Sequence, residues 1–145
     1  MPITLRAGST ELIALPRWKP RVLVVEDDPS CLEGLRRSLH RGYDVAPCRT
    51  PLEAIYEFGR KPPALMIIDY LLPHVRGVQL AQLLKSCTAC DIPLVLISGH
   101  SESAVPMESL DCAFLKKPFA TEELLGLLSR LLPSQTPTPD RPAGP

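Results

Sequence analysis

Three short runs of almost purely apolar residues, each followed by a polar or acidic residue, constrain the fold of this chain most strongly. They are Val22–Val25, Ala64–Ile68 and Pro93–Ile97. Each run has the length of a strand, and a strand without polar residues must be buried on both of its faces. Such strands are typical of a parallel sheet that is covered by helices on both sides.

Further strands and helices alternate with these runs. Two shorter strands of mixed polarity are expected at Tyr43–Ala46 and Cys112–Leu115, and their mixed character suits the edges of a sheet. Leucine spacing, helix-starting prolines and acidic first turns predict helices at Pro29–His40, Pro51–Phe58, Val78–Lys85 and Thr121–Leu132. The alternation predicts an α/β fold, a flavodoxin-like doubly wound five-stranded parallel sheet of order 2-1-3-4-5, because this order buries the three apolar strands and keeps the crossovers right-handed.

The length of 145 residues gives room for one ordinary domain, which we place at residues 21–133. Residues 1–20 form an N-terminal extension, in which the apolar segment Leu12–Leu15 could pack on the domain or bind a partner. Residues 134–145 are rich in proline and lack large apolar side chains, so we expect a disordered tail.

Charge and hydropathy exclude several classes of partner. The 16 basic and 16 acidic residues balance, which leaves no net field to attract nucleic acid or a membrane surface. No apolar run is long enough for a membrane span or for the core of a signal peptide, so we expect a cytoplasmic protein. Cys87 and Cys90 form a C-x-x-C pair without the second pair or the histidines of a zinc site, and free thiols are the expectation.

Polar residues follow four of the expected strands at the points where these strands end. Glu26 and Asp27 follow the first strand, Asp69 the third, Ser98 the fourth and Lys117 the fifth. The carboxyl ends of parallel strands meet at one edge of the sheet, where such folds place their sites. Converging carboxylates repel one another unless a cation neutralises them, and oxygen ligands alone select a hard ion such as Mg²⁺. A lysine and a hydroxyl would bind a phosphoryl group carried by a carboxylate.

Each of these residues also has a simple structural interpretation, as the end of a strand, a turn, a loop or a solvated side chain. For Asp28 the structural interpretation is preferred, because an aspartate before Pro29 is a typical helix cap. Thr121 likewise makes a good start for the last helix. The functional interpretation depends on all the strand-end residues occurring together, which is much less frequent than any one of them alone.

The same segments resemble the motifs of response-regulator receiver domains. Val22–Pro29 is similar to the acidic opening of that family, and Ile67–Pro73 to its phosphoacceptor segment. Leu94–Gly99 resembles the hydroxyl-bearing strand, and Phe114–Phe119 the aromatic–lysine–proline element. The resemblance covers residues 21–133 and every motif.

The resemblance implies a role for each residue at the acidic edge. It implies that Asp69 accepts a phosphoryl group and that Asp27 binds Mg²⁺ directly. Glu26 would assist through a water molecule, and the backbone carbonyl of Leu71 would be a further ligand.

The resemblance also implies the parts of the switch. Ser98 would contact a phosphoryl oxygen, Lys117 would pair with the phosphate, and Phe114 would be the aromatic residue that moves with Ser98. The bond between Lys117 and Pro118 is a candidate cis peptide.

Two departures from the family pattern concern the surface of the domain. Arg76 stands before Gly77 where a small polar helix cap is usual, and arginine caps helices poorly. The stretch from Ser98 to Lys117 is about one helical turn shorter than usual and contains Pro106, which predicts a shortened fourth helix.

The resulting prediction is a phosphorylation-dependent signalling switch rather than a metabolic enzyme. Its phosphoryl donor would be a histidine kinase or histidine phosphotransfer protein, and it would act on an unknown downstream protein, as a monomer or weak dimer. The residues after Leu132 are too few to build a DNA-binding output domain. The alternative is a receiver-like interaction module that works without phosphorylation.

Two enzyme classes fit poorly. A dehalogenase-type hydrolase would need a second carboxylate where Leu71 stands. A dinucleotide-binding domain would need a glycine-rich turn in place of Glu26 and Asp27.

Overall fold

The computed structural model describes residues 18–99 and 111–132. Their centre is a five-stranded parallel sheet whose order is β2-β1-β3-β6-β7. The strands are β1 (Arg21–Val25), β2 (Asp44–Cys48), β3 (Leu65–Asp69), β6 (Leu94–Ser98) and β7 (Ala113–Lys116). Numbered among themselves, these strands have the predicted order 2-1-3-4-5, so the predicted α/β fold is confirmed.

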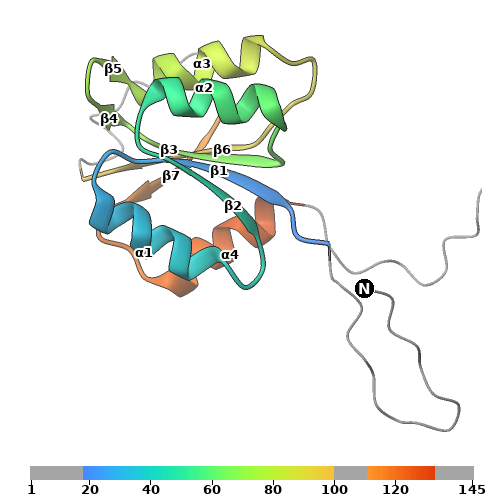
Figure 1. The fold of residues 1–145 in the computed structure, drawn as a ribbon. Coiled ribbons are helices and arrows are strands. Elements are labelled where there is room, and N and C mark those ends of the chain that lie inside the picture. Colours follow the sequence, from blue (N-terminus) through green and yellow to red (C-terminus); the bar gives the residue numbers. More distant parts are fainter. Residues whose placement is uncertain (1–17, 100–110, 133–145) are drawn as a thin grey trace, which may run out of the picture.

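Helices cover both faces of the sheet. Figure 1 shows α2 (Pro51–Arg60) and α3 (Gly77–Ser86) on one face, and α1 (Pro29–Leu39) and α4 (Thr121–Leu131) on the other. Alternate residues of each central strand feed two separate cores: Leu23 and Val25 face α2 and α3, whereas Val22 and Val24 face α1 and α4. Burial on both faces explains why these strands are apolar throughout. None of the described helices is long and apolar enough to cross a membrane.

The edge strand β2 extends further than the sequence suggested. The strand was expected to end at Ala46, but it continues through Pro47, which cannot donate a backbone hydrogen bond, to Cys48. The backbone N–H of Asp44 donates to the carbonyl of Pro20, directly before β1, and the carbonyl of Cys48 accepts from the backbone N–H of Glu26, directly after β1. Alternation along the strand therefore turns the backbone of Pro47 to the outer edge, where its missing N–H costs no ladder hydrogen bond.

A short hairpin after β3 was not predicted. β4 (Leu71–Leu72) and β5 (Val75–Arg76) pair antiparallel, and the turn between them holds His74 at a φ of 68°. A positive φ in a residue other than glycine is uncommon, and the sequence has no Asn-Gly or Asp-Gly pair to signal a hairpin here.

The helix ends follow the sequence at some points and differ from it at others. The carboxylate of Asp28 accepts from the backbone N–H of Ser30 at 3.2 Å, so the predicted cap of α1 is confirmed. α4 begins at Thr121, as expected, with Glu122 and Glu123 in its first turn. Its cap position is Ala120, and the hydroxyl of Thr121 lies 3.1 Å from that of Ser38 on α1, so it contributes to the contact between the two helices.

Other predictions are settled by single observations. Arg76 does precede α3 without a side-chain cap, and Gln79 compensates by accepting the backbone N–H of Arg76 at 3.0 Å. All five cysteines lie in the described residues, and none of them forms a disulfide bond, as expected. The peptide bond between Lys117 and Pro118 is cis. The predicted shortened fourth helix, the segment Leu12–Leu15 and the tail 134–145 fall outside the described residues.

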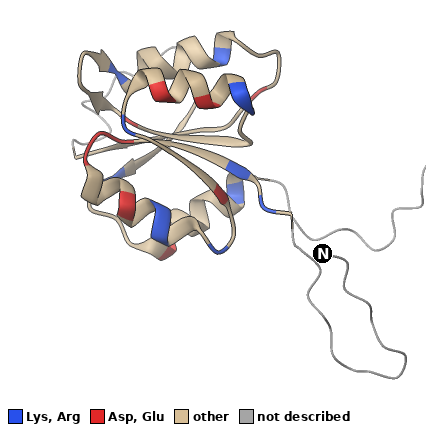
Figure 2. Ribbon diagram, in the orientation of Figure 1, with Lys and Arg blue, Asp and Glu red and all other residues tan. Residues whose placement is uncertain are grey.

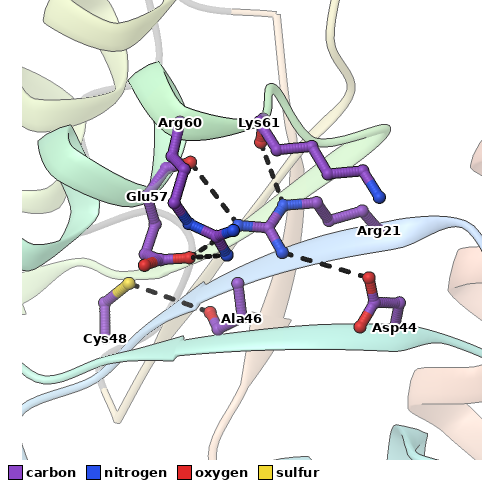
Figure 3. A network of polar contacts seen from close by, with 7 residues as sticks. All are labelled: Arg21, Asp44, Ala46, Cys48, Glu57, Arg60 and Lys61. Atoms are coloured by element: carbon purple, nitrogen blue, oxygen red, sulfur yellow. Dashed lines mark hydrogen bonds and ion pairs between the residues drawn. The ribbon is translucent and has the colours of Figure 1, made fainter.

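A buried arginine anchors the start of β1. The guanidinium of Arg21, which is 8% exposed, donates to the backbone carbonyl of Lys61 at 2.9 Å and to Glu57 Oε1 at 2.7 Å. It also lies 3.9 Å from Asp44 Oδ2 on β2 (Figure 3). A buried charge is tolerated only when it is paired and hydrogen-bonded in this way. The network ties β1 to the end of α2, at the amino ends of the strands.

Candidate functional site

The predicted site residues meet at the carboxyl edge of the sheet. Glu26 and Asp27 directly follow β1, Asp69 and Ser98 are the last residues of β3 and β6, and Lys117 follows β7. Backbone hydrogen bonds hold these residues in place. The N–H of Glu26 donates to the carbonyl of Cys48 at 2.9 Å, and the N–H of Lys117 donates to the carbonyl of Ser98 at 2.8 Å. The sheet therefore brings together side chains that are far apart in the sequence.

Glu26, Asp27 and Asp69 form an acidic cluster. Each offers a carboxylate oxygen, and these oxygens all lie within 4.8 Å of one another. Glu26 is 1% exposed and Asp69 6% exposed. Figure 2 shows basic and acidic residues interspersed over both helix layers, and an acidic loop at the end of β1. The concentration of negative charge at this edge is thus local, and the chain as a whole is neutral.

Lys117 partly compensates the acidic cluster. Its Nζ lies 2.6 Å from Glu26 Oε1 and 3.0 Å from Asp69 Oδ2. Burial lowers the pKa of Lys117, but the hydrogen bonds to Glu26 and Asp69 outweigh this effect and raise it overall. Lys117 is therefore positively charged at neutral pH, and its single ammonium group faces the three carboxylates of the acidic cluster.

The two buried carboxylates are oriented in the same way. One oxygen of each accepts from Lys117, and the other accepts a backbone N–H: Leu71 N–H donates to Asp69 Oδ1 at 3.1 Å, and Asp28 N–H donates to Glu26 Oε2 at 3.2 Å. Burial and the neighbouring Glu26 nevertheless raise the pKa of Asp69 to about 6, against the pull of Lys117. The charged form of Asp69 is therefore disfavoured as the structure stands, and an added cation would relieve it.

Gly77 supports the site, although its role was not predicted from the sequence. A Cβ atom at this position would lie 2.1 Å from the backbone oxygen of Asp69, and the Gly77 N–H donates to the carbonyl of Tyr70 at 2.8 Å. Only glycine allows α3 to start this close to the end of β3. The available signal was a glycine directly before the expected helix Val78–Lys85, eight residues after Asp69.

Cys31 is a second neighbour that was not predicted. Burial, followed by a hydrogen bond to Glu26, raises the pKa of its thiol to about 12. The thiol therefore stays protonated at neutral pH and adds no further negative charge to the acidic cluster.

Ser98 and Phe114 lie on the neighbouring strands. Ser98 is 1% exposed, and Phe114, which is half-buried, packs against the core under α2 and α3. Phe114 is paired in register with Leu96, two residues before Ser98. The structure thus brings four predicted residues into direct proximity and places Ser98 beside them at the same strand edge, whereas Phe114 packs in the core behind them.

Residues 22–129 match the family model of the response regulator receiver domain. The chain belongs to the response regulator receiver domain family. Curated relatives agree: the chain is 34% identical over 129 residues to the response regulator MprA of Mycobacterium sp. strain KMS, and 34% identical over 116 residues to that of Mycobacterium leprae. These matches cover 85% and 77% of this chain but 56% and 50% of the relatives, so the receiver spans about half of their length.

Solved structures give the same fold. The chemotaxis protein CheY4 of Vibrio cholerae has a TM-score of 0.73 at 22% identity, covering 79% of this chain and all of that one (100%). The response regulator TrrA of Thermotoga maritima, solved in complex with Mg²⁺–BeF, has a TM-score of 0.69 at 27% identity, covering 78% and 99%. The chain is thus a receiver domain of the kind used in two-component signalling.

Proposed function

We propose that this receiver is a phosphorylation-dependent switch and that Asp69 is the phosphoacceptor. The observation that carries the proposal is the setting of the Asp69 carboxylate, with one oxygen on Leu71 N–H, the other on Lys117, and two further carboxylates beside it. These contacts fix the orientation of the Asp69 carboxylate, which is the nucleophile. They also leave an excess of negative charge that a cation can neutralise.

The phosphoryl donor in this proposal is the phosphohistidine of a histidine kinase or of a histidine phosphotransfer protein. An oxygen of Asp69 attacks the phosphorus, a P–O bond forms, the P–N bond breaks, and the imidazole leaves and takes up a proton. The ammonium group of Lys117 then pairs with a phosphoryl oxygen instead of the Asp69 carboxylate. The hydroxyl of Ser98 donates a hydrogen bond to a second phosphoryl oxygen. The movement of Ser98 frees space that Phe114 occupies, which changes the surface offered to a downstream protein.

The acidic cluster fits Mg²⁺ as the cofactor. Its donors are oxygens only, and carboxylates, carbonyls and water are the ligands that this ion prefers. Asp27, Asp69 and the backbone carbonyl of Leu71 would bind the ion directly, and Glu26 would act through a water molecule. When bound, Mg²⁺ supplies positive charge against the phosphoryl oxygens. The protein's own contribution is to hold these ligands at one strand edge.

The proposal also covers the limits of the switch. The receiver comprises residues 21–133, in agreement with the matched residues 22–129, and residues 1–20 and 134–145 lie outside it. The chain catalyses only its own phosphorylation and a slow dephosphorylation. It acts as a monomer or a weak dimer.

Phosphorylation with acetyl phosphate tests this proposal. Intact-protein mass spectrometry is expected to show one phosphoryl adduct with Mg²⁺, none in EDTA, and none in the Asp69→Asn variant. Asp28→Asn is the matched control, because it removes a neighbouring carboxylate yet keeps a good helix cap. It should retain the adduct. An adduct that persists in Asp69→Asn would refute the assignment, and no adduct in any form would favour an interaction module that works without phosphorylation.

A further inference from the structure

Helix α2 has an apolar stripe on its outer side. Leu52, Ile55 and Tyr56 are 75%, 42% and 66% exposed, and they are three of the six large apolar side chains that are exposed in the described residues. Together with Gly59 they occur at positions i, i+3, i+4 and i+7, so they lie along one side of the helix, opposite its buried residues. Neighbouring apolar side chains left exposed in this way mark a contact surface more often than single ones do.

Gly59 leaves a gap at one end of this stripe. A Cβ atom at Gly59 would meet no other part of the domain within 4 Å, and the residue has no positive φ. Gly34 on α1 and Gly126 on α4 are equally open, but neither of these two helices has a large apolar side chain that is exposed. Among the described helices, α2 alone combines an open glycine with exposed apolar neighbours. A second helix can therefore approach α2 closely at Gly59, where a large apolar side chain would fill the gap.

The charges beside the stripe make this surface complementary to itself. Glu53 lies in the first turn of α2 and Arg60 in its last turn, and both side chains are exposed. They are seven residues apart, about two helical turns or about 10 Å, so they lie on the same flank of the stripe. In Figure 2 the acidic residues of α2 precede a basic residue at its end. When a second α2 packs antiparallel along the stripe, Glu53 of each copy faces Arg60 of the other, whereas parallel packing would place like charges opposite each other.

Both charged groups can form a further contact. Glu53 uses Oε1 to accept from the backbone N–H of Arg49 at 2.8 Å, and Arg60 uses Nη2 to donate to Glu57 Oε1 at 2.8 Å. Within the described part of the chain, Oε2 of Glu53 and Nη1 of Arg60 make no hydrogen bond. Glu53 also lines a groove of about 390 Å³ between α2 and the edge strand β2. This groove leaves room for the guanidinium of a second copy beside the Glu53 carboxylate.

We propose that two copies of this chain associate through antiparallel α2 helices, related by a twofold axis near Tyr56. Leu52 of each copy fills the gap at Gly59 of the other, and the two Tyr56 rings pack together at the axis. Glu53 of each copy pairs with Arg60 of the other, so every contact occurs twice and one surface serves both copies.

The size and position of this contact determine how the dimer behaves. A contact made by one helix of 10 residues is smaller than the roughly 1,200 Å² that stable complexes bury, so the dimer is weak. The contact shares no residue with the acidic cluster, so the dimer forms without phosphorylation.

Sedimentation velocity of the unphosphorylated full chain tests the association. Between about 10 µM and about 1 mM, the average mass should rise from that of one chain toward that of two. Gly59→Gln should weaken the association about tenfold or more, because its side chain would enter the space that Leu52 of the other copy fills. Urea denaturation of the dilute variant should show no loss of stability, since glycine is a poor helix former and the position is open.

Gly126→Gln is the matched control, because it introduces the same side chain at an equally open position on α4. It should associate like the wild type. A wild type that stays a single chain over the whole range would overturn the proposal. A dimer that survives Gly59→Gln, or one that is lost in Gly126→Gln, would also overturn it.

An exchange of the two charges tests the antiparallel arrangement. Glu53→Arg and Arg60→Glu should each weaken the association about tenfold, because both symmetric pairs become repulsive. The double variant should associate like the wild type, since each arginine again faces a glutamate of the other copy. It loses the same contacts within its own chain as the single variants, so its recovery reports pairing between copies. A double variant that associates as poorly as the single ones would contradict the antiparallel dimer.

Discussion

Replacing Asp69 by asparagine removes one negative charge from the acidic cluster and is expected to stabilise the folded protein. In the folded state the pKa of Asp69 rises from its ordinary value of 3.8 to about 6. A rise of about 2 pKa units corresponds to roughly 3 kcal/mol of unfavourable interaction in the charged form. Asparagine keeps an oxygen for the Leu71 N–H but leaves Lys117 with a weaker partner, so the expected gain is about 1–3 kcal/mol.

The pH dependence gives the sign of the effect. Because the folded-state pKa lies above the unfolded one, the ionised carboxylate destabilises the folded state fully above pH 6 and not at all well below pH 3.8. The advantage of Asp69→Asn should therefore be largest near pH 8 and fall to about a third of that value at pH 4.5. Added Mg²⁺ should stabilise the wild type and leave the variant almost unchanged.

Urea denaturation followed by circular dichroism measures these differences, with EDTA present except where Mg²⁺ is tested. Asp28→Asn is again the control, because it also removes one carboxylate but preserves the cap of α1, and its stability should stay within about 0.5 kcal/mol of the wild type. A less stable Asp69→Asn at pH 8, or a gain that does not shrink at pH 4.5, would refute the reasoning.

Three further predictions address the support of the site, the lifetime of the phosphoryl group and the anchor of β1. Gly77→Ala should lower the free energy of unfolding, measured by urea denaturation, by about 2–4 kcal/mol, because its Cβ would lie 2.1 Å from the Asp69 carbonyl oxygen. The control Gly59→Ala, in a helix with open space around the glycine, should be neutral or stabilising. Leu71→Asn should speed phosphate loss measured by mass spectrometry, because an apolar side chain that is 46% exposed beside the site cannot orient the attacking water; slower or unchanged decay would count against this explanation. Arg21→Met should lower the free energy of unfolding by about 1–3 kcal/mol, since two hydrogen-bonded contacts to α2 and its end are lost, and an unchanged midpoint would show that the network contributes only to specificity.

The sequence by itself determined the architecture and most of the site. The apolar runs ending at Val25, Ile68 and Ile97 identified strands buried on both faces, because polar side chains there would have no hydrogen-bonding partners in such a sheet. Parallel strands then place whatever follows them at one edge, and this alone grouped Asp69 with the acidic residues after β1 and with Lys117.

Local patterns were less informative where two effects compete. The strand β2 was expected to end at Ala46, but it continues through Pro47. The direction in which a backbone N–H points depends on the register of the sheet, and the missing N–H of Pro47 faces outward. The β4–β5 hairpin needs a positive φ at His74, and no local residue type announced it. Thr121 begins α4 as expected, but no local pattern showed that its hydroxyl lies beside that of Ser38, 83 positions away.

Only the tertiary structure decided how the charges are shared at the site. Lys117 and Glu26 are 91 positions apart, and nothing near either residue in the sequence shows that one ammonium binds two buried carboxylates whose remaining oxygens are held by backbone N–H groups. The same holds for the closeness of Gly77 to the Asp69 backbone. The local sequence shows which face of an element is buried, because burial produces the hydrophobic periodicity. The distances between charged groups depend on how whole elements pack together, and the local sequence does not show this.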